Sequence, residues 1–403
     1  MPKASIYRQL DAVQVTGPHL PPSPRHWNCG LISYKGRLWM CLRYHLTAAH
    51  ASRCATAMIA LDRKTFQPTG PFQHLNLVAT VGDEHFEDAR LFLFRGEPHI
   101  SYTQMTGYQP GKTYFCTMKY AKLKLVGSTW HVVKTFHPRF GQNDGSAREK
   151  NWAFFEYNNE LFAVYSDGPV RKVIQLDGER VVTVHESLAA KWSWGMIRGG
   201  TPPIPYGKDK MLAIFHSSLA TERAPHFVRY YGGAYLFDAK PPFAVTAICD
   251  RPLMTGSEED GHGFDPRYSE GWKPFIPFPC GLVRAKPADE SAGWLVSLGV
   301  NDWQCAVGRV KPEQINWVRP DGSDRVMRYF KTKNGSLPVQ IIGENGQLRW
   351  LPWQVIADAG RGIMAPPGYF ATMDGREAEM LGDVPRADEI SVGEYEKATK
   401  KSA

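Results

Sequence analysis

The sequence contains no run of about 18 apolar residues, which is the length that a membrane-spanning helix needs. Its first residues, MPKASIYRQLDAVQ, also lack the apolar segment of a secretory signal peptide. We therefore expect a cytoplasmic protein with no membrane partner.

Paired cysteines are missing as well. The seven cysteines are an odd number, they are widely scattered, and no two of them form a CxxC pair. This pattern argues against a disulfide framework and against a structural zinc site, so we expect buried thiols.

The signature motifs of several enzyme classes are also absent. The sequence has no Walker loop, no GxGxxG motif linked to a strand and no GxSxG elbow. Nucleotide hydrolysis and serine-esterase chemistry therefore lose their main support.

The chain has a formal charge of +8, but its Lys and Arg residues form no basic run. Nucleic-acid binding proteins concentrate such charge on one tract or face, so we expect no nucleic-acid partner. A phosphate or a phosphorylated sugar suits this balance better. Surface charge that only aids solubility is an equally good explanation.

Amphipathic helical patterns are nearly absent, whereas short β-branched and aromatic runs recur between Gly, Asn, Asp and Pro residues. Paired runs surround tight turns at Lys35-Gly36, Arg95-Gly96 and Asn158-Asn159, which are residue types that tolerate positive φ. The chain is thus expected to be all-β and rich in hairpins.

The turn residues Gly36, Gly96 and Asn159 recur at spacings of 60 and 63 residues. This spacing fits one four-stranded propeller blade. Two looser units follow, from GGTPPIPYGKDKMLAIFH and from PFIPFPCGLVRA. The expected architecture is a five-bladed β-propeller over residues 20–315. Residues 1–19 would lead into it, residues 316–380 would form a β-rich extension packed on it, and residues 381–403 would be a flexible tail.

Polar clusters fall near the start of each unit, where the innermost strand of a blade would line the axis. They are Trp27-Asn28 with Arg43, then Glu87-Asp88-Ala89-Arg90, Glu149-Lys150-Asn151-Trp152, Arg198-Gly199-Gly200-Thr201 with His216, and Asn301-Asp302. Repetition of this kind would concentrate charge on the axis.

These motifs resemble glycoside hydrolase family 130, the mannoside phosphorylases and β-mannosidases, together with related five-bladed propeller glycosyltransferases. The resemblance runs in order from residue 20 to about residue 310 and includes Glu87-Asp88-Ala89-Arg90, the Gly-Gly-Thr-Pro-Pro run, the His216 and Tyr231 pair, Leu-Phe-Asp-Ala-Lys-Pro-Pro, and Gly-Val-Asn-Asp. Departures from the family are Ala89 in place of the usual Pro, Cys29-Gly30 after Asn28, and the length of chain after Val310.

The resemblance implies a carbohydrate substrate, with phosphate or a sugar phosphate as partner, and an inverting phosphorylase acting on mannosides. It puts Asp88 in the role of general acid, with Glu87 beside it and Arg90 holding the carboxyl group or binding sugar hydroxyls. Phosphate needs a cationic cradle, for which the matched residues are Arg43, Lys150, His216 and Tyr231. Asn28, Asn151 and Asp302 are the remaining expected substrate-binding residues.

Other interpretations stay open. An inverting hydrolase needs a second carboxylate about 6.5–9.5 Å from the first, and Asp302, Glu156 and Asp167 are candidates. A related glycosyltransferase would use the same site, and a non-catalytic glycan-binding propeller would use none of this chemistry. Taken singly, Glu87-Asp88 could be an ordinary turn, an Arg a surface ion pair and a His a core residue.

The loop around Asp260, His262 and Asp265 carries several metal-ligating residue types. Its spacing fits neither an EF-hand loop nor a zinc site, so we expect a polar surface loop, no metal and no cofactor. Whether the protein forms a homo-oligomer is not indicated by the sequence.

Overall fold

The computed structural model describes residues 5–23, 25–45, 54–77, 85–106, 115–146, 148–168, 170–220, 228–257, 260, 276–321, 326–331, 339–342, 348–351 and 388–390. The helices whose bounds are described are α1 (Ile6–Gln9) and the 3₁₀-helix η3 (Pro312–Gln314), and Asp260 also has 3₁₀ conformation. No helix in this part of the chain is long and apolar enough to cross a membrane.

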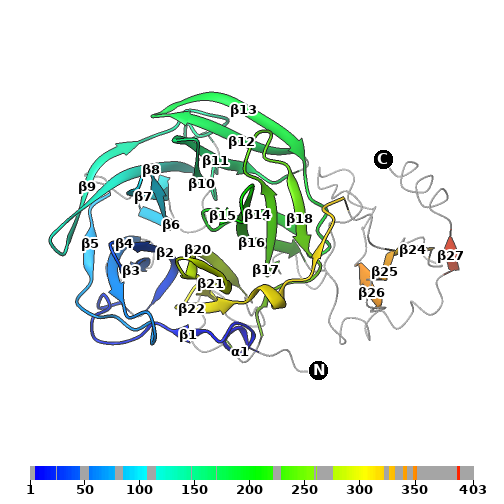
Figure 1. Cartoon of the computed structure of the whole chain (residues 1–403), viewed down its shortest axis with the longest axis horizontal. Coiled ribbons are helices and arrows are strands. Elements are labelled where there is room, and N and C mark those ends of the chain that lie inside the picture. The colour runs from blue at the N-terminus through cyan, green and yellow to red at the C-terminus, as the bar shows by residue number, and fades with distance from the viewer. Residues whose placement is uncertain are drawn as a thin grey trace.

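The strands form antiparallel sheets arranged around a common centre, which is a β-propeller arrangement (Figure 1). The first three sheets follow the chain in order. They comprise β2 (His26–Tyr34), β3 (Arg37–His45), β4 (Cys54–Leu61) and β5 (Gln73–Leu75); β6 (His85–Phe94), β7 (Glu97–Thr106), β8 (Phe115–Val126) and β9 (Thr129–Phe136); and β10 (Ala153–Tyr157), β11 (Glu160–Ser166), β12 (Val170–Asp177) and β13 (Arg180–Leu188).

A larger sheet and a fourth four-stranded sheet complete the arrangement. The larger one has seven strands: β14 (Met196–Gly200), β15 (Ile204–Tyr206), β16 (Lys210–Ala220), β17 (Val228–Asp238), β18 (Val245–Cys249), β19 (Met254–Thr255) and β23 (Trp317–Val318). The four-stranded one has β20 (Pro277–Lys286), β21 (Asp289–Val300), β22 (Gln304–Val310) and β1 (Val13–Gln14).

The expectation of five four-stranded blades needs correction at the seven-stranded sheet. Four sheets are regular four-stranded blades, whereas β15 and β19 pair with β16 and β17, and β23 extends the far edge beyond β18. The larger size therefore comes from three short strands, β15, β19 and β23. They pair with backbone groups that a four-stranded sheet would leave unpaired.

All three predicted hairpin turns are confirmed. Tyr34 pairs with Arg37, Phe94 with Glu97 and Tyr157 with Glu160, so each loop has two residues. Both residues of each loop have positive φ, as a type I′ turn requires. Local sequence therefore determines the register of these hairpins.

Aromatic side chains fill the spaces between neighbouring sheets. Trp39 of β3 meets Trp130 of β9 edge to face at 5.1 Å, and Phe92 of β6 stacks on Phe154 of β10 at 5.2 Å. These large side chains bury much apolar area and fix the angle between sheets. The seven cysteines are also buried thiols, as expected.

The two ends of the propeller region meet in one sheet. Val13 of β1 pairs with Val307 of β22, so a strand from residues 1–19 completes the sheet that β20, β21 and β22 begin. The expected lead-in thus contributes a strand to the propeller itself. Closure of this kind leaves β22 without an open edge.

The innermost strands lie close together at the centre. β2 contacts β6 and β20, and β6 contacts β10. Glycine permits this approach: a Cβ atom at Gly281 would overlap the backbone nitrogen of Leu31, and one at Gly199 would overlap the carbonyl oxygen of Asn151.

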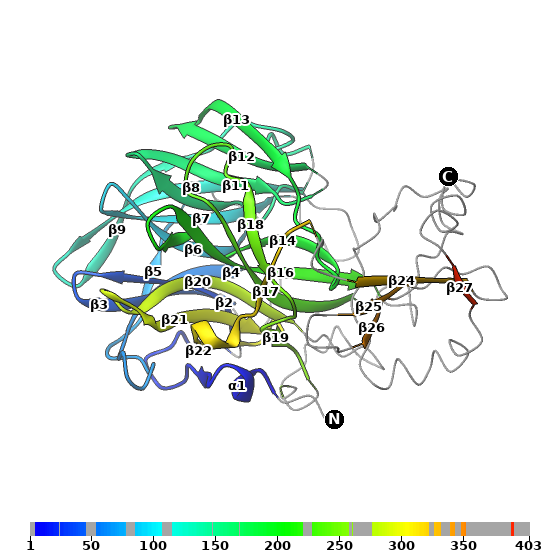
Figure 2. The ribbon, with the colours of Figure 1, turned by 45° about the vertical axis from the view of Figure 1, so that its right-hand side comes forward.

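A further four-stranded sheet lies beyond residue 321. It contains β24 (Val326–Lys331), β25 (Val339–Ile342), β26 (Leu348–Leu351) and β27 (Asp388–Ile390). Figures 1 and 2 both show these strands to one side of the propeller. β27 falls within residues 381–403, which the sequence predicted as a tail.

Candidate functional site

Two equivalent bulges place polar side chains at the centre of the propeller. The register shifts between Trp27 and Gly30 in β2, and between Glu87 and Arg90 in β6. Asn28 has a φ of 51° and Asp88 a φ of 54°, a left-handed conformation that Asn and Asp tolerate better than most residues. A bulge re-aims the side chain that it carries.

These bulges bring Asn28 and Asp88 together. Asn28 Nδ2 donates a hydrogen bond to Asp88 Oδ1 at 2.7 Å, and Arg43 Nη1 lies 3.6 Å from the same oxygen. Asp88 is 6% exposed. One carboxyl oxygen of the predicted general acid is therefore held by the protein.

Glu87 binds two of the predicted cationic residues. Its Oε1 lies 2.5 Å from Arg43 Nη2, and its Oε2 lies 2.6 Å from Lys150 Nζ. Arg43 belongs to β3 and Lys150 precedes β10, so this carboxylate joins three consecutive sheets. Both oxygens of Glu87 are engaged by cations.

Arg90 is fully buried. Its Nη1 donates to the backbone oxygen of Asp88 at 3.1 Å, its Nε to the oxygen of Gly200 at 2.6 Å, and its Nη2 to Asn151 Oδ1 at 3.0 Å. Arg90 thus supports the backbone at Asp88 and connects sheets at the axis. Asn151 faces Arg90 with its side-chain oxygen.

His216 of β16 is packed among aromatic rings. Its ring lies 4.5 Å from Phe278 and is stacked on Tyr230 at 5.8 Å. Burial, followed by the positive charges of Arg198 and Arg90, holds the pKa of His216 well below 6.5. The imidazole is therefore neutral near pH 7 and contributes no positive charge to a phosphate cradle.

The structure places Tyr231 away from this cluster. Tyr231 pairs with Ser217 in the β17–β16 register, and its buried ring meets Trp194 at 5.2 Å. Successive residues of a strand point to opposite faces, so the neighbouring Tyr230 faces His216. Sequence analysis missed Tyr230 because the sequence does not show which of two adjacent tyrosines points toward His216.

Tyr230 is surrounded by charges of both signs. Burial raises its pKa, and the carboxylates of Asp302 and Asp88 raise it further, whereas Arg198 and Lys150 lower it. Residues from several sheets therefore act on one half-buried hydroxyl group.

Asn301 and Asp302 occupy the turn between β21 and β22, not the innermost strand of their sheet. Both have positive φ. Asn301 Oδ1 accepts a hydrogen bond from the backbone of Ile276 at 2.9 Å. Asn301 therefore holds the start of β20, while Asp302 is the residue of the pair that acts electrostatically on Tyr230.

Two alternative carboxylates lie outside the cluster. Glu156 Oε2 accepts from the backbone nitrogen of Arg95 at the exposed end of a hairpin. Asp167 forms an ion pair with the fully buried Arg171 and accepts from the hydroxyl of Tyr235 at 3.2 Å. Both contacts connect sheets, so neither carboxylate is placed to assist Asp88.

Asp260 has a structural set of partners. Its Oδ1 accepts from the backbone of Ile6 at 2.8 Å, and its Oδ2 accepts from the backbone of Ser257 at 2.8 Å. His262 and Asp265 lie outside the described residues. Within the described ranges, no group of three or more His, Cys, Asp and Glu residues is arranged to hold a metal ion.

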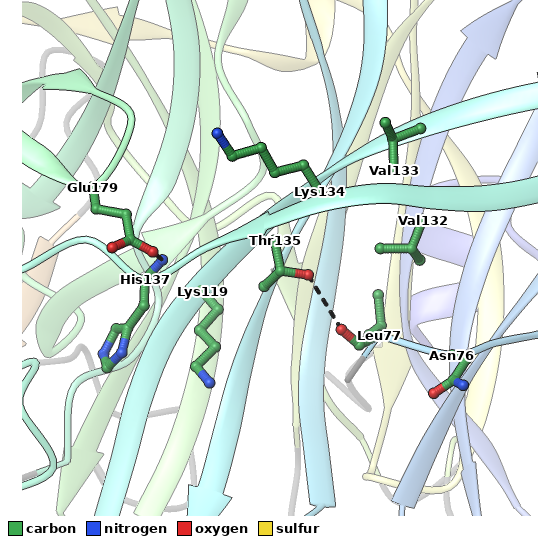
Figure 3. A pocket seen from close by; sticks show the side chains of 9 residues that line it. All are labelled: Asn76, Leu77, Lys119, Val132, Val133, Lys134, Thr135, His137 and Glu179. Carbon is green, nitrogen blue, oxygen red and sulfur yellow. Dashed lines mark hydrogen bonds between the residues drawn. The ribbon is translucent and has the colours of Figure 1, made fainter. Parts of the chain in front are cut away.

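A cavity of about 460 Å³ lies at the outer edge of the propeller and not among these residues (Figure 3). It is lined by Asn76, Leu77, Lys119, Val132, Val133, Lys134, Thr135, His137 and Glu179. None of the predicted site residues takes part, and the backbone nitrogen of His137 donates a hydrogen bond there to Glu179 Oε1. We therefore place the candidate site at the axis, where the carboxyl groups and cations gather.

Chemically, the axial cluster offers one carboxyl group held at a single oxygen, a second neutralised by two cations, and a phenol beside a neutral imidazole. Such a set can transfer one proton and accommodate an anion. Arg198 already belongs to the predicted Arg198-Gly199-Gly200-Thr201 cluster, whereas only the strand pairing shows that Tyr230 is the tyrosine that faces His216.

A comparison with protein-family models gives no match, and neither does a comparison with curated protein sequences. Solved structures with a similar fold include a glycosyl hydrolase from Bacteroides ovatus, with a TM-score of 0.50 and 14% identity over 77% of this chain and 93% of that one. Others are the β-1,2-mannobiose phosphorylase of Listeria innocua (TM-score 0.47, 14% identity, 73% and 93% covered) and the mannose phosphorylase MPT-4 of Leishmania mexicana (0.47, 12%, 77% and 92%). At these identities the likeness concerns the fold.

Proposed function

We propose that this chain is a carbohydrate-active enzyme of the family 130 type, an inverting glycoside phosphorylase that acts on mannosides. We also propose that the seven-stranded sheet is one blade of a five-bladed propeller, in which residues 20–315 hold the active site. The glycosyl hydrolase fold of the Bacteroides ovatus protein supports the general class.

The observation that carries the proposal is the contrast between Asp88 and Glu87. Asp88 has one oxygen held by Asn28, which leaves Oδ2 to carry a proton. Both oxygens of Glu87 are paired with cations, so it is poorly suited to serve also as the base that activates a water molecule. A site with one proton donor and nearby cations suits an acceptor such as phosphate, which needs no base to activate it.

In the proposed reaction, Asp88 Oδ2 gives its proton to the glycosidic oxygen as the bond from that oxygen to the anomeric carbon breaks. A phosphate oxygen bonds to the anomeric carbon from the opposite face, which inverts its configuration and yields a sugar 1-phosphate. The hydrogen bond from Asn28 and the charge of Arg43 stabilise the carboxylate that Asp88 becomes. The proton balance is restored from solvent.

The test is to incubate the wild-type protein and Asp88→Asn with a panel of β-mannosides, with and without phosphate, and to measure sugar 1-phosphate and free sugar. Sugar 1-phosphate that depends on phosphate and disappears in the variant supports the proposal. Free sugar in both conditions indicates a β-glycosidase that uses Asp302 as base. No turnover of any donor favours a glycosyltransferase with another donor or a glycan-binding propeller.

A further inference from the structure

Arg198 lies in the middle of β14, the innermost strand of the seven-stranded sheet. It pairs with His216 in the register of β14 and β16, just before the bulge that leads to Gly200. The backbone beside it lies against the Lys150–Asn151 segment, because a Cβ atom at Gly199 would overlap the carbonyl oxygen of Asn151. The residue that follows Arg198 therefore contacts the segment that carries Lys150 and Asn151 of the axial cluster.

The other cations of the cluster are already engaged. Arg43 and Lys150 are bound to Glu87, and Arg90 is buried with three hydrogen bonds. Arg198, in contrast, is exposed, and in the part of the chain that the structure describes no carboxylate forms an ion pair with it.

Electrostatic effects show what lies within reach of this guanidinium. Its charge lowers the pKa of His216 and that of Tyr230, and the second of these residues is also influenced by Asp88 and Lys150. Arg198 is thus paired with His216 in the sheet and lies near enough to His216 and Tyr230 for its charge to affect both. His216 is neutral and Arg90 is buried, so Arg198 is the exposed cation of the three.

We propose that Arg198 binds the anionic group of the substrate, either inorganic phosphate or the phosphate of a sugar 1-phosphate. This inference rests on the proposed function: Arg198 would bind the phosphate that serves as acceptor in the proposed reaction. A guanidinium suits the task because it can donate two parallel hydrogen bonds to a phosphate group, and its exposure lets the anion enter without breaking an existing ion pair.

The experiment is titration calorimetry with inorganic phosphate and, separately, with mannose 1-phosphate. The proteins are the wild type, Arg198→Gln, Arg198→Lys and the control Arg180→Gln, which removes an exposed arginine paired with Asp177 on the outer hairpin of another sheet. We expect Arg198→Gln to weaken binding of both ligands by about tenfold or more, Arg198→Lys to weaken it less, and the control to match the wild type.

Equal affinity of Arg198→Gln and wild type for both ligands would overturn the inference, as would a wild type that binds neither. Weakening with mannose 1-phosphate alone would place Arg198 at the product phosphate and not at the free acceptor. Turnover separates this test from that of the proposed function. Phosphorolysis by the wild type with unchanged binding in Arg198→Gln defeats only the inference, whereas lost binding without any phosphorolysis defeats only the proposed function.

Discussion

Asn28 donates its side-chain amide to Asp88 Oδ1 across 2.7 Å, although 60 residues separate the two in sequence. Each occupies the left-handed position of a bulge in an innermost strand, one in β2 and one in β6. The repeat of the propeller thus supplies the predicted proton donor in one sheet and its hydrogen-bonding partner in the next.

The first prediction concerns this hydrogen bond. Asn28→Gly removes the amide while keeping a residue that tolerates positive φ. A hydrogen bond to a charged group contributes about 1.5–3 kcal/mol, so kcat is expected to fall by about tenfold to a hundredfold with little change in KM. The control is Asn158→Gly, at an exposed turn with a φ of 50°, which should keep full activity. Equal activity of the two variants would contradict a positioning role.

The second prediction concerns the carboxylate that joins three sheets. Glu87→Gln leaves Arg43 and Lys150 without their shared counter-ion in a poorly solvated place, so the free energy of unfolding should fall by about 2–4 kcal/mol. Glu186→Gln removes the partner of Lys172 at an exposed ion pair and should cost less than about 1 kcal/mol. Urea unfolding of both variants measures the difference. Equal stability would mean that Glu87 contributes no more than a surface charge.

The third prediction concerns Arg90. Arg90→Lys cannot reproduce the three hydrogen bonds to Asp88, Gly200 and Asn151, and it leaves buried acceptors without donors, so unfolding should become easier by about 3 kcal/mol or more. The matched control, Arg95→Lys, alters an exposed arginine that donates to Asn159 at a hairpin. A thermal unfolding midpoint of Arg90→Lys equal to that of the control would argue against an axial role.

The fourth prediction concerns pH. The pKa of His216 is well below 6.5 in the folded protein, so below that pH the unfolded chain binds a proton that the folded protein does not. The stability that neutral His216 contributes is therefore present above pH 6.5 and is lost as the pH falls toward the folded pKa. The slope from this one group approaches about 1.4 kcal/mol per pH unit.

His216→Phe removes the titrating imidazole while keeping an aromatic ring between Phe278 and Tyr230. The free energy of unfolding should then decline less steeply between pH 6.5 and 5.5 than in the wild type. The difference in slope should be at most that of one titrating group, about 1.4 kcal/mol per pH unit. Equal slopes in urea titrations across this range would show that His216 is not the group responsible.

Much of the fold follows from local sequence. Lys35-Gly36, Arg95-Gly96 and Asn158-Asn159 could be assigned as hairpin turns because two adjacent residues with positive φ restrict the residue types that fit. Their regular spacing then predicted a propeller. The size of the seven-stranded sheet could not be predicted in this way, because β23 joins it from beyond residue 316 by backbone pairing that has no local signal.

The sequence by itself indicated the hairpins and the candidate axial residues, since Asn28, Glu87, Asp88 and Lys150 occur at repeated places in repeated units. Only the tertiary structure decided which groups act together. It selected Tyr230 over Tyr231, because a shift of one residue in a strand turns a side chain to the opposite face. It also joined Glu87 to Arg43 and Lys150, because consecutive sheets of the propeller meet at one axis.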